Sequence, residues 1–129
     1  MLVLLTQFFG ALLGMLAVIF GAFGAHALKK KASAAQLASF ETGVKYQIYH
    51  ALVLLVLGYN FSYNNPLEDY IVGCFLLGTF LFSFSIYGLV LAGIAGKKAR
   101  FLGPITPLGG LLLTIGWALL AYTYIEEII

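Results

Sequence analysis

The sequence predicts an all-α membrane protein, one domain over residues 1–129 in which four transmembrane helices form an up-and-down bundle. Hydrophobic residues make up 62% of the chain and charged residues 9%, whereas soluble domains carry about a quarter charged residues. Four apolar stretches come close to or exceed the roughly 20 residues that a membrane-crossing helix needs. These predicted helices cover about residues 2–28, 43–59, 70–94 and 107–124.

The basic residues predict the orientation of these helices. All seven fall in two short regions, Lys29, Lys30, Lys31 and Lys45 in the first, and Lys97, Lys98 and Arg100 in the second. Lys and Arg are retained on the cytoplasmic side of a membrane. We therefore expect a multi-pass protein of the bacterial cytoplasmic (inner) membrane with both termini outside.

The first apolar stretch is predicted to be a retained helix and not a signal peptide. No Lys or Arg precedes it, and it is longer than the roughly 7–15 residues of a signal-peptide core. Small residues repeat along it at Gly10, Gly14, Gly21 and Ala25. Such a stripe lets helices approach closely, so it indicates either a seam within the bundle, which we favour, or a contact with a second chain.

The connection after the first helix has a helix-start signal of its own. Ser33 and Gln36 have the spacing of a capping box, and Leu37 and Phe40 share one helical face. This pattern predicts a short interfacial helix in the first inner loop. The alternative interpretation is an extension of the second transmembrane helix toward the cytoplasm.

The remaining elements begin with turn and capping residues. Asn65 and Pro66 form a turn before the third helix, because Pro66 cannot continue a preceding helix. Thr106 is expected to cap the fourth helix, with Pro107 in its first turn, where no amide donor is needed.

Polar side chains are expected to gather in the cytoplasmic half of the bundle. Ionisable groups within a membrane helix are costly, so by default they indicate a functional site; the alternative is that they serve as polar ties between helices. Glu41, Lys45 and Tyr49 recur every four residues, and Tyr46 and His50 form a second pair on a neighbouring strip. The predicted polar cluster consists of His26, Glu41, Lys45, Tyr46, Tyr49, His50, Ser83, Ser85 and Tyr87.

A second candidate site lies at the start of the fourth helix. Its first-turn amides and the neighbouring basic residues could bind an anion or a phospholipid headgroup. The alternative is a rigid helix start whose glycines allow close packing. The residues of this predicted anion site are Lys97, Lys98, Arg100, Thr106, Gly109 and Gly110.

The sequence offers little for catalysis or for a metal. The single cysteine, Cys74, excludes an internal disulfide and a Cys-based metal cage. Two histidines and one glutamate could converge, but Cys74 is expected near the opposite face, so this set only reaches the lower limit of the three or four protein ligands usual for zinc. No nucleophile-elbow sequence is present. We predict no catalytic residue, no metal and no cofactor, and the small net charge of +2 argues against a nucleic-acid partner.

Four strings of residues together resemble the YgdD family, small bacterial inner-membrane proteins of a domain-of-unknown-function family with mitochondrial relatives. The strings are GAFGAH at 21–26, FETGVKYQIYHAL at 40–52, SFSIY at 83–87 and LGPITPLGG at 102–110. The resemblance covers nearly the whole chain. It implies a four-crossing integral membrane protein and no established reaction.

These observations predict a non-enzymatic accessory or scaffold protein that binds another membrane component through its cytoplasmic half. The alternative is binding or transport of a lipid or small amphiphile through the polar cluster, and an enzyme acting on lipid is a third hypothesis. The expected partners are membrane lipids and either a membrane protein or further copies of this chain.

Overall fold

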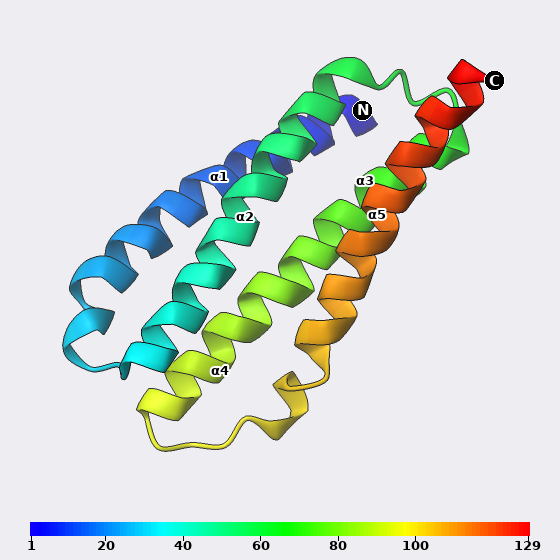
Figure 1. The fold of residues 1–129 in the computed structure, drawn as a ribbon. Coiled ribbons are helices and arrows are strands. Elements are labelled where there is room, and N and C mark those ends of the chain that lie inside the picture. The colour runs from blue at the N-terminus through cyan, green and yellow to red at the C-terminus, as the bar shows by residue number, and fades with distance from the viewer.

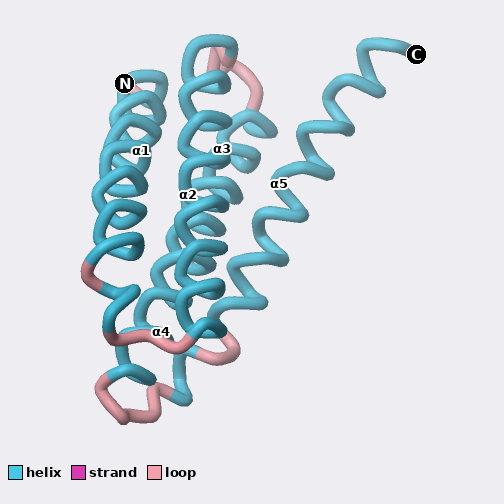
Figure 2. Tube along the Cα trace, turned by 60° about the vertical axis from the view of Figure 1, so that its left-hand side comes forward, coloured by secondary structure: helices cyan, strands magenta, loops and turns pink.

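The computed structural model describes residues 1–129 and consists of helices and short connections (Figure 1, Figure 2). The all-α prediction is confirmed. The elements in chain order are α1 (Leu2–His26), a 3₁₀ turn (Leu28–Lys30), α2 (Ala34–Asn60), α3 (Pro66–Thr79), a π-helical turn (Phe80–Phe84), α4 (Ser85–Ile94), a 3₁₀ turn (Arg100–Leu102) and α5 (Ile105–Ile128).

The long helices lie side by side in the order of the chain. Figure 1 shows α1 beside α2, α2 beside the continuous rod made by α3, the π-helical turn and α4, and α5 beside that rod. Both termini and the α2–α3 connection lie at one end of the molecule. The two connections that carry Lys29–Lys31 and Lys97–Arg100 lie at the other, which we call the basic end.

Three of the long helical segments have the length and composition of membrane spans. They are Leu2–Lys30, Pro66–Ile94 and Arg100–Ile128. Only 27 of the 129 residues are buried, and large apolar side chains such as Leu4, Val18 and Leu111 lie on the outer surface. That distribution is expected where the surrounding solvent is lipid, because apolar side chains then gain nothing by turning inward.

Small residues form the seam between α1 and α2. A Cβ atom added to Gly10 would lie 3.0 Å from the Leu55 side chain, and one added to Gly24 would lie 2.9 Å from the Phe40 ring. Gly14 and Gly21 face α2 as well. The favoured interpretation of the stripe, a seam within the protein, is therefore confirmed, although the stripe ends at Gly24 because Ala25 is exposed.

The predicted interfacial helix is wrong, because α2 runs without a break from Ala34 to Asn60. The capping box itself is present, with Ser33 Oγ accepting from the Gln36 amide at 3.1 Å and Gln36 Oε1 accepting from the Ser33 amide at 2.9 Å. Phe40 is 2% exposed and belongs to a core cluster with Leu28 and Tyr87. Turning this segment onto a membrane surface would uncover that ring, so packing keeps it in line with α2.

Helix α5 begins earlier than predicted and without the expected cap. Its N-cap position is Pro104, and no side chain caps it. Thr106 Oγ1 instead lies 2.6 Å from Ser85 Oγ of α4. Since α4 continues to Ile94, about two and a half turns of α4 extend past the start of α5 toward the basic end.

The α2–α3 connection is fastened to α1 by Tyr63. Its backbone has a φ of 57°, a left-handed conformation that a bulky residue adopts only when its surroundings enforce it. The amide of Tyr63 donates to the Glu68 carboxylate at 2.6 Å, and its hydroxyl donates to Thr6 Oγ1 at 2.7 Å. Burial raises the pKa of the Tyr63 phenol, the hydrogen bond to Thr6 opposes that shift, and the nearby Asp69 and Glu68 charges add to it.

Candidate functional site

The predicted polar cluster divides into a buried part and an exposed part. His50, Ser83, Ser85 and Tyr87 are buried between helices. The other five members lie on the outer surface, namely His26, Glu41, Lys45, Tyr46 and Tyr49. The nine residues therefore do not converge on one cavity.

A residue that the sequence analysis missed, Gln47, is the centre of the buried part. It is 0% exposed. Its Nε2 donates to the Leu13 carbonyl of α1 at 2.8 Å, and its Oε1 accepts from the Tyr87 hydroxyl of α4 at 2.6 Å. One side chain thus joins α1, α2 and α4. Its spacing from Gly43, His50 and Ala51, which share its buried face, is the sequence signal that could have identified it.

The two serines join other pairs of helices. Ser83, in the π-helical turn, donates from its hydroxyl to the Gly43 carbonyl of α2 at 2.7 Å. Ser85 shares a hydrogen bond with Thr106 of α5 and donates to the Phe82 carbonyl at 3.0 Å. Serine hydroxyls commonly tie helices together in this way where water is absent.

His50 joins α2 to α5 through a second residue that the sequence analysis missed, Trp117. His50 Nδ1 lies 2.7 Å from the Tyr46 carbonyl oxygen, and the Trp117 indole nitrogen donates to His50 Nε2 at 3.2 Å. A carbonyl can only accept and an indole N–H can only donate. The two contacts therefore fix a neutral imidazole with its proton on Nδ1. No spacing in the sequence indicated that the only tryptophan would lie beside this histidine.

The interior leaves no polar atom free for a ligand. Every buried side-chain nitrogen and oxygen has a hydrogen-bond partner within the chain. No group of three or more His, Cys, Asp or Glu side chains is arranged to hold a metal ion. Gln47, His50, Ser83 and Ser85 form hydrogen bonds from one helix to another. This is the arrangement that the alternative interpretation, polar ties between helices, describes.

The residues of the predicted anion site also separate into an exposed group and a group packed between helices. Lys97, Lys98 and Arg100 are exposed in the α4–α5 connection. Gly109 is buried against the π-helical turn, where a Cβ atom would lie 2.4 Å from the Phe82 nitrogen. Gly110 faces the Phe82 ring, with 3.7 Å between an added Cβ and the nearest ring atoms. The two glycines thus permit the close packing of α5 on Phe82.

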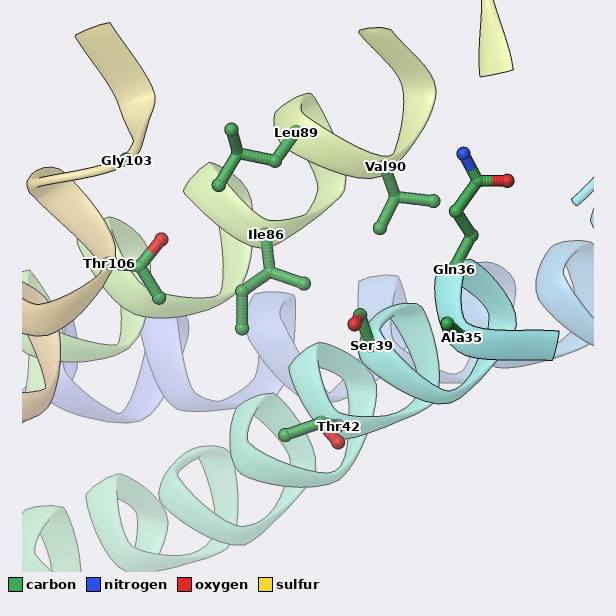
Figure 3. Close-up of a pocket in the computed structure, with 9 residues that line it drawn as sticks. All are labelled: Ala35, Gln36, Ser39, Thr42, Ile86, Leu89, Val90, Gly103 and Thr106. Carbon is green, nitrogen blue, oxygen red and sulfur yellow. The ribbon is translucent and has the colours of Figure 1, made fainter. Parts of the chain in front are cut away.

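An accessible groove lined by both polar and apolar residues lies at the basic end, where α4 extends past the start of α5. We call it the α2–α4 groove; it has a volume of about 540 Å³. Figure 3 shows Ile86 and Val90 pointing from α4 toward α2, and Gln36 extending from the first turn of α2 alongside the end of α4. Its lining residues are Ala35, Gln36, Ser39, Thr42, Ile86, Leu89, Val90, Gly103 and Thr106.

The fold and this arrangement of polar groups define a helical multi-pass membrane protein whose buried polar side chains are paired and whose α2–α4 groove opens at the basic end. Comparison with known sequences then gives the family. The family model described as a protein of unknown function, DUF423, matches residues 20–110. The chain belongs to this family.

Individual relatives agree with that assignment. The UPF0382 inner membrane protein YgdD of Escherichia coli K12 is 38% identical over 113 residues, which are 87% of this chain and 82% of the relative. The UPF0382 membrane protein of Staphylococcus saprophyticus is 40% identical over 111 residues, 86% of this chain and 88% of the relative. The predicted resemblance and the inner-membrane location are confirmed. No solved structure matches the chain.

Proposed function

We propose that this chain is a four-crossing inner-membrane protein that binds another membrane component through its cytoplasmic half, as an accessory or scaffold and not as an enzyme. Both termini and the α2–α3 connection would lie outside. The α2–α4 groove would be the place of contact.

The length and surroundings of α2 support a fourth crossing. Its 27 residues span about 40 Å, more than the roughly 30 Å hydrocarbon core. The polar side chains of its middle, Gln47 and His50, are buried and paired. Lys45 is exposed, and a long lysine side chain can reach the membrane surface from about one turn inside. The positions of the seven basic residues then support the orientation.

The observation that carries the proposal is the complete pairing of buried polar atoms. A catalytic or transport site inside the bundle would need polar groups available to a substrate, and the interior offers none unpaired. Recognition then falls to the surface, where the α2–α4 groove combines hydroxyl and amide groups with apolar side chains beside a basic connection. Because the buried polar atoms are paired with one another, transport through the polar cluster is a weaker hypothesis than binding at the groove.

A photo-crosslinking amino acid placed at Ser39 tests the proposal in the native membrane. Ser39 lines the groove, and the matched control position is Thr114, an exposed residue of α5 away from it. We expect a discrete adduct from position 39, identified by mass spectrometry as protein or lipid, and none from position 114. Equal adducts from both positions, or none from position 39, would contradict the proposal.

A further inference from the structure

The α2–α4 groove opens sideways toward the surrounding membrane because of where α5 begins. Thr106, in the first turn of α5, is level with Ser85, so no helix covers the last turns of α4 on that side. The connection from Ala95 to Pro104 passes around the end of the groove and contributes Gly103 to its lining. The groove is therefore bounded by α2, α4, the first turn of α5 and a loop.

The two walls of the groove differ in chemistry. The α2 wall presents the Gln36 amide and the Ser39 side chain (Figure 3). Thr42 also lines this wall, but its hydroxyl donates to the Ala38 carbonyl of its own helix. The α4 wall presents the apolar side chains of Ile86, Leu89 and Val90. A ligand that fits both walls has a polar group that accepts hydrogen bonds joined to an apolar chain.

Hydrogen-bond donors remain available on the polar wall. Gln36 Oε1 is occupied by the Ser33 amide, so the NH₂ end of the side chain is the end free to donate. That end lies against Gly93, where an added Cβ would come within 3.1 Å of Nε2. Ser39 is exposed on the turn between Gln36 and Thr42. No acidic residue lines the groove, so nothing in the lining repels a negative charge.

The loop next to the groove carries basic residues. The α4–α5 connection, which supplies Gly103 to the lining, also carries Lys97, Lys98 and Arg100, all exposed. Basic residues at the cytoplasmic surface attract anionic headgroups within a Debye length. The donors, the apolar wall and the basic connection together match a phosphodiester with acyl chains attached.

We propose that the α2–α4 groove binds the headgroup of an anionic phospholipid from the cytoplasmic leaflet. The phosphate takes the donors of Gln36 and Ser39, the basic connection neutralises it, and the first part of an acyl chain lies on Ile86 and Val90. This inference rests on the proposed function and names its membrane component. Because α2 is longer than the hydrocarbon core is thick, its first turns extend beyond the core. Gln36 and Ser39 would then lie at the depth of the headgroups.

Native mass spectrometry of the purified protein in mixed micelles tests the inference. The probes are phosphatidylglycerol, which is anionic, and phosphatidylcholine with the same acyl chains, which is net neutral. We expect one phosphatidylglycerol to be retained in preference to phosphatidylcholine, and inorganic phosphate to leave it in place. Equal retention of the two lipids would overturn the inference, and displacement by phosphate would assign the site to a free anion.

Two variants and a matched control connect retention to the groove. Ser39→Leu with Thr42→Leu fills the polar wall, and Lys97→Gln with Lys98→Gln and Arg100→Gln removes the neighbouring charge. Each should lower phosphatidylglycerol retention by about tenfold or more. Thr114→Leu is the control, because Thr114 and Thr42 are both exposed helical threonines whose hydroxyls bond the carbonyl four residues before.

The charge variant changes only exposed residues of a connection, so it keeps the test decisive if the groove-filling variant fails to fold. Full lipid retention in the folded charge variant would overturn the inference. A protein adduct from position 39 without lipid retention would support the proposed function. It would show that the bound membrane component is a protein and not a lipid.

Discussion

The Tyr87 hydroxyl donates a 2.6 Å hydrogen bond to Gln47 Oε1, and the other end of the same amide donates to the Leu13 carbonyl. Gln47 is completely buried, so its amide and its two partners depend on one another. A lone buried amide in an apolar interior would be destabilising, whereas this one is satisfied at both ends and joins three helices.

Replacing Gln47 should therefore destabilise the protein more than the change in side-chain volume alone would. Gln47→Leu keeps the volume but leaves the Tyr87 hydroxyl and the Leu13 carbonyl without their partner. We expect a loss of about 1–3 kcal/mol, measured as a lower midpoint of thermal unfolding in detergent. In Tyr87→Phe the added loss from Gln47→Leu should shrink, because the pair is already broken. Strictly additive losses would show that the two side chains act independently.

Close packing of α5 on the π-helical turn predicts a sharp difference between two helical glycines. Gly109→Ala places a Cβ atom 2.4 Å from the Phe82 nitrogen, and backbone cannot move aside as a side chain can. We expect a destabilisation of about 1–3 kcal/mol. Gly73→Ala is the control, since nothing lies within 4 Å of its added Cβ. That variant should be slightly more stable than wild type, by up to about 1 kcal/mol.

The His50 contacts predict a single tautomer. With the Tyr46 carbonyl at Nδ1 and the Trp117 indole N–H at Nε2, the neutral ring should carry its proton on Nδ1. Nitrogen-15 chemical shifts of labelled histidine in mildly alkaline buffer report this directly. His26 is exposed and serves as the internal comparison, with a mixture of tautomers expected. Trp117→Phe removes the indole donor but keeps the Tyr46 carbonyl at Nδ1, so the Nδ1-protonated form of His50 should persist in that variant.

The orientation can be tested with single cysteines in a Cys74→Ser background. Lys98→Cys, in the α4–α5 connection, should react with an impermeant thiol reagent only after the cytoplasmic side is opened. Asn64→Cys, in the α2–α3 connection, should react in intact cells. Labelling of the cysteine at position 98 from outside would refute the proposed topology.

The sequence predicted where the long helices lie, because they follow from apolar length and from Pro and Asn at turns. It placed the starts of the second and third too late, at residues 43 and 70, whereas α2 begins at Ala34 and α3 at Pro66. It also predicted the capping box at Ser33, whose geometry is local. It failed at Phe40 and Thr106, whose settings depend on which helix lies beside them. Gln47 and Trp117 were missed for the same reason: the importance of each comes from a partner distant in the sequence, Tyr87 for one and His50 for the other.

The complete pairing of buried polar atoms separates the residues that hold the protein together from those exposed to its surroundings. A saturation mutagenesis experiment that scores cellular abundance and lipid retention independently would display this separation. Substitutions at Gln47, Ser83 or Gly109 would lower both scores together, because the protein made would be less stable. Substitutions at Ser39 or Lys98 would lower retention while abundance stayed near wild type. Residues of the second kind mark the surface on which natural selection for function, as distinct from folding, can act.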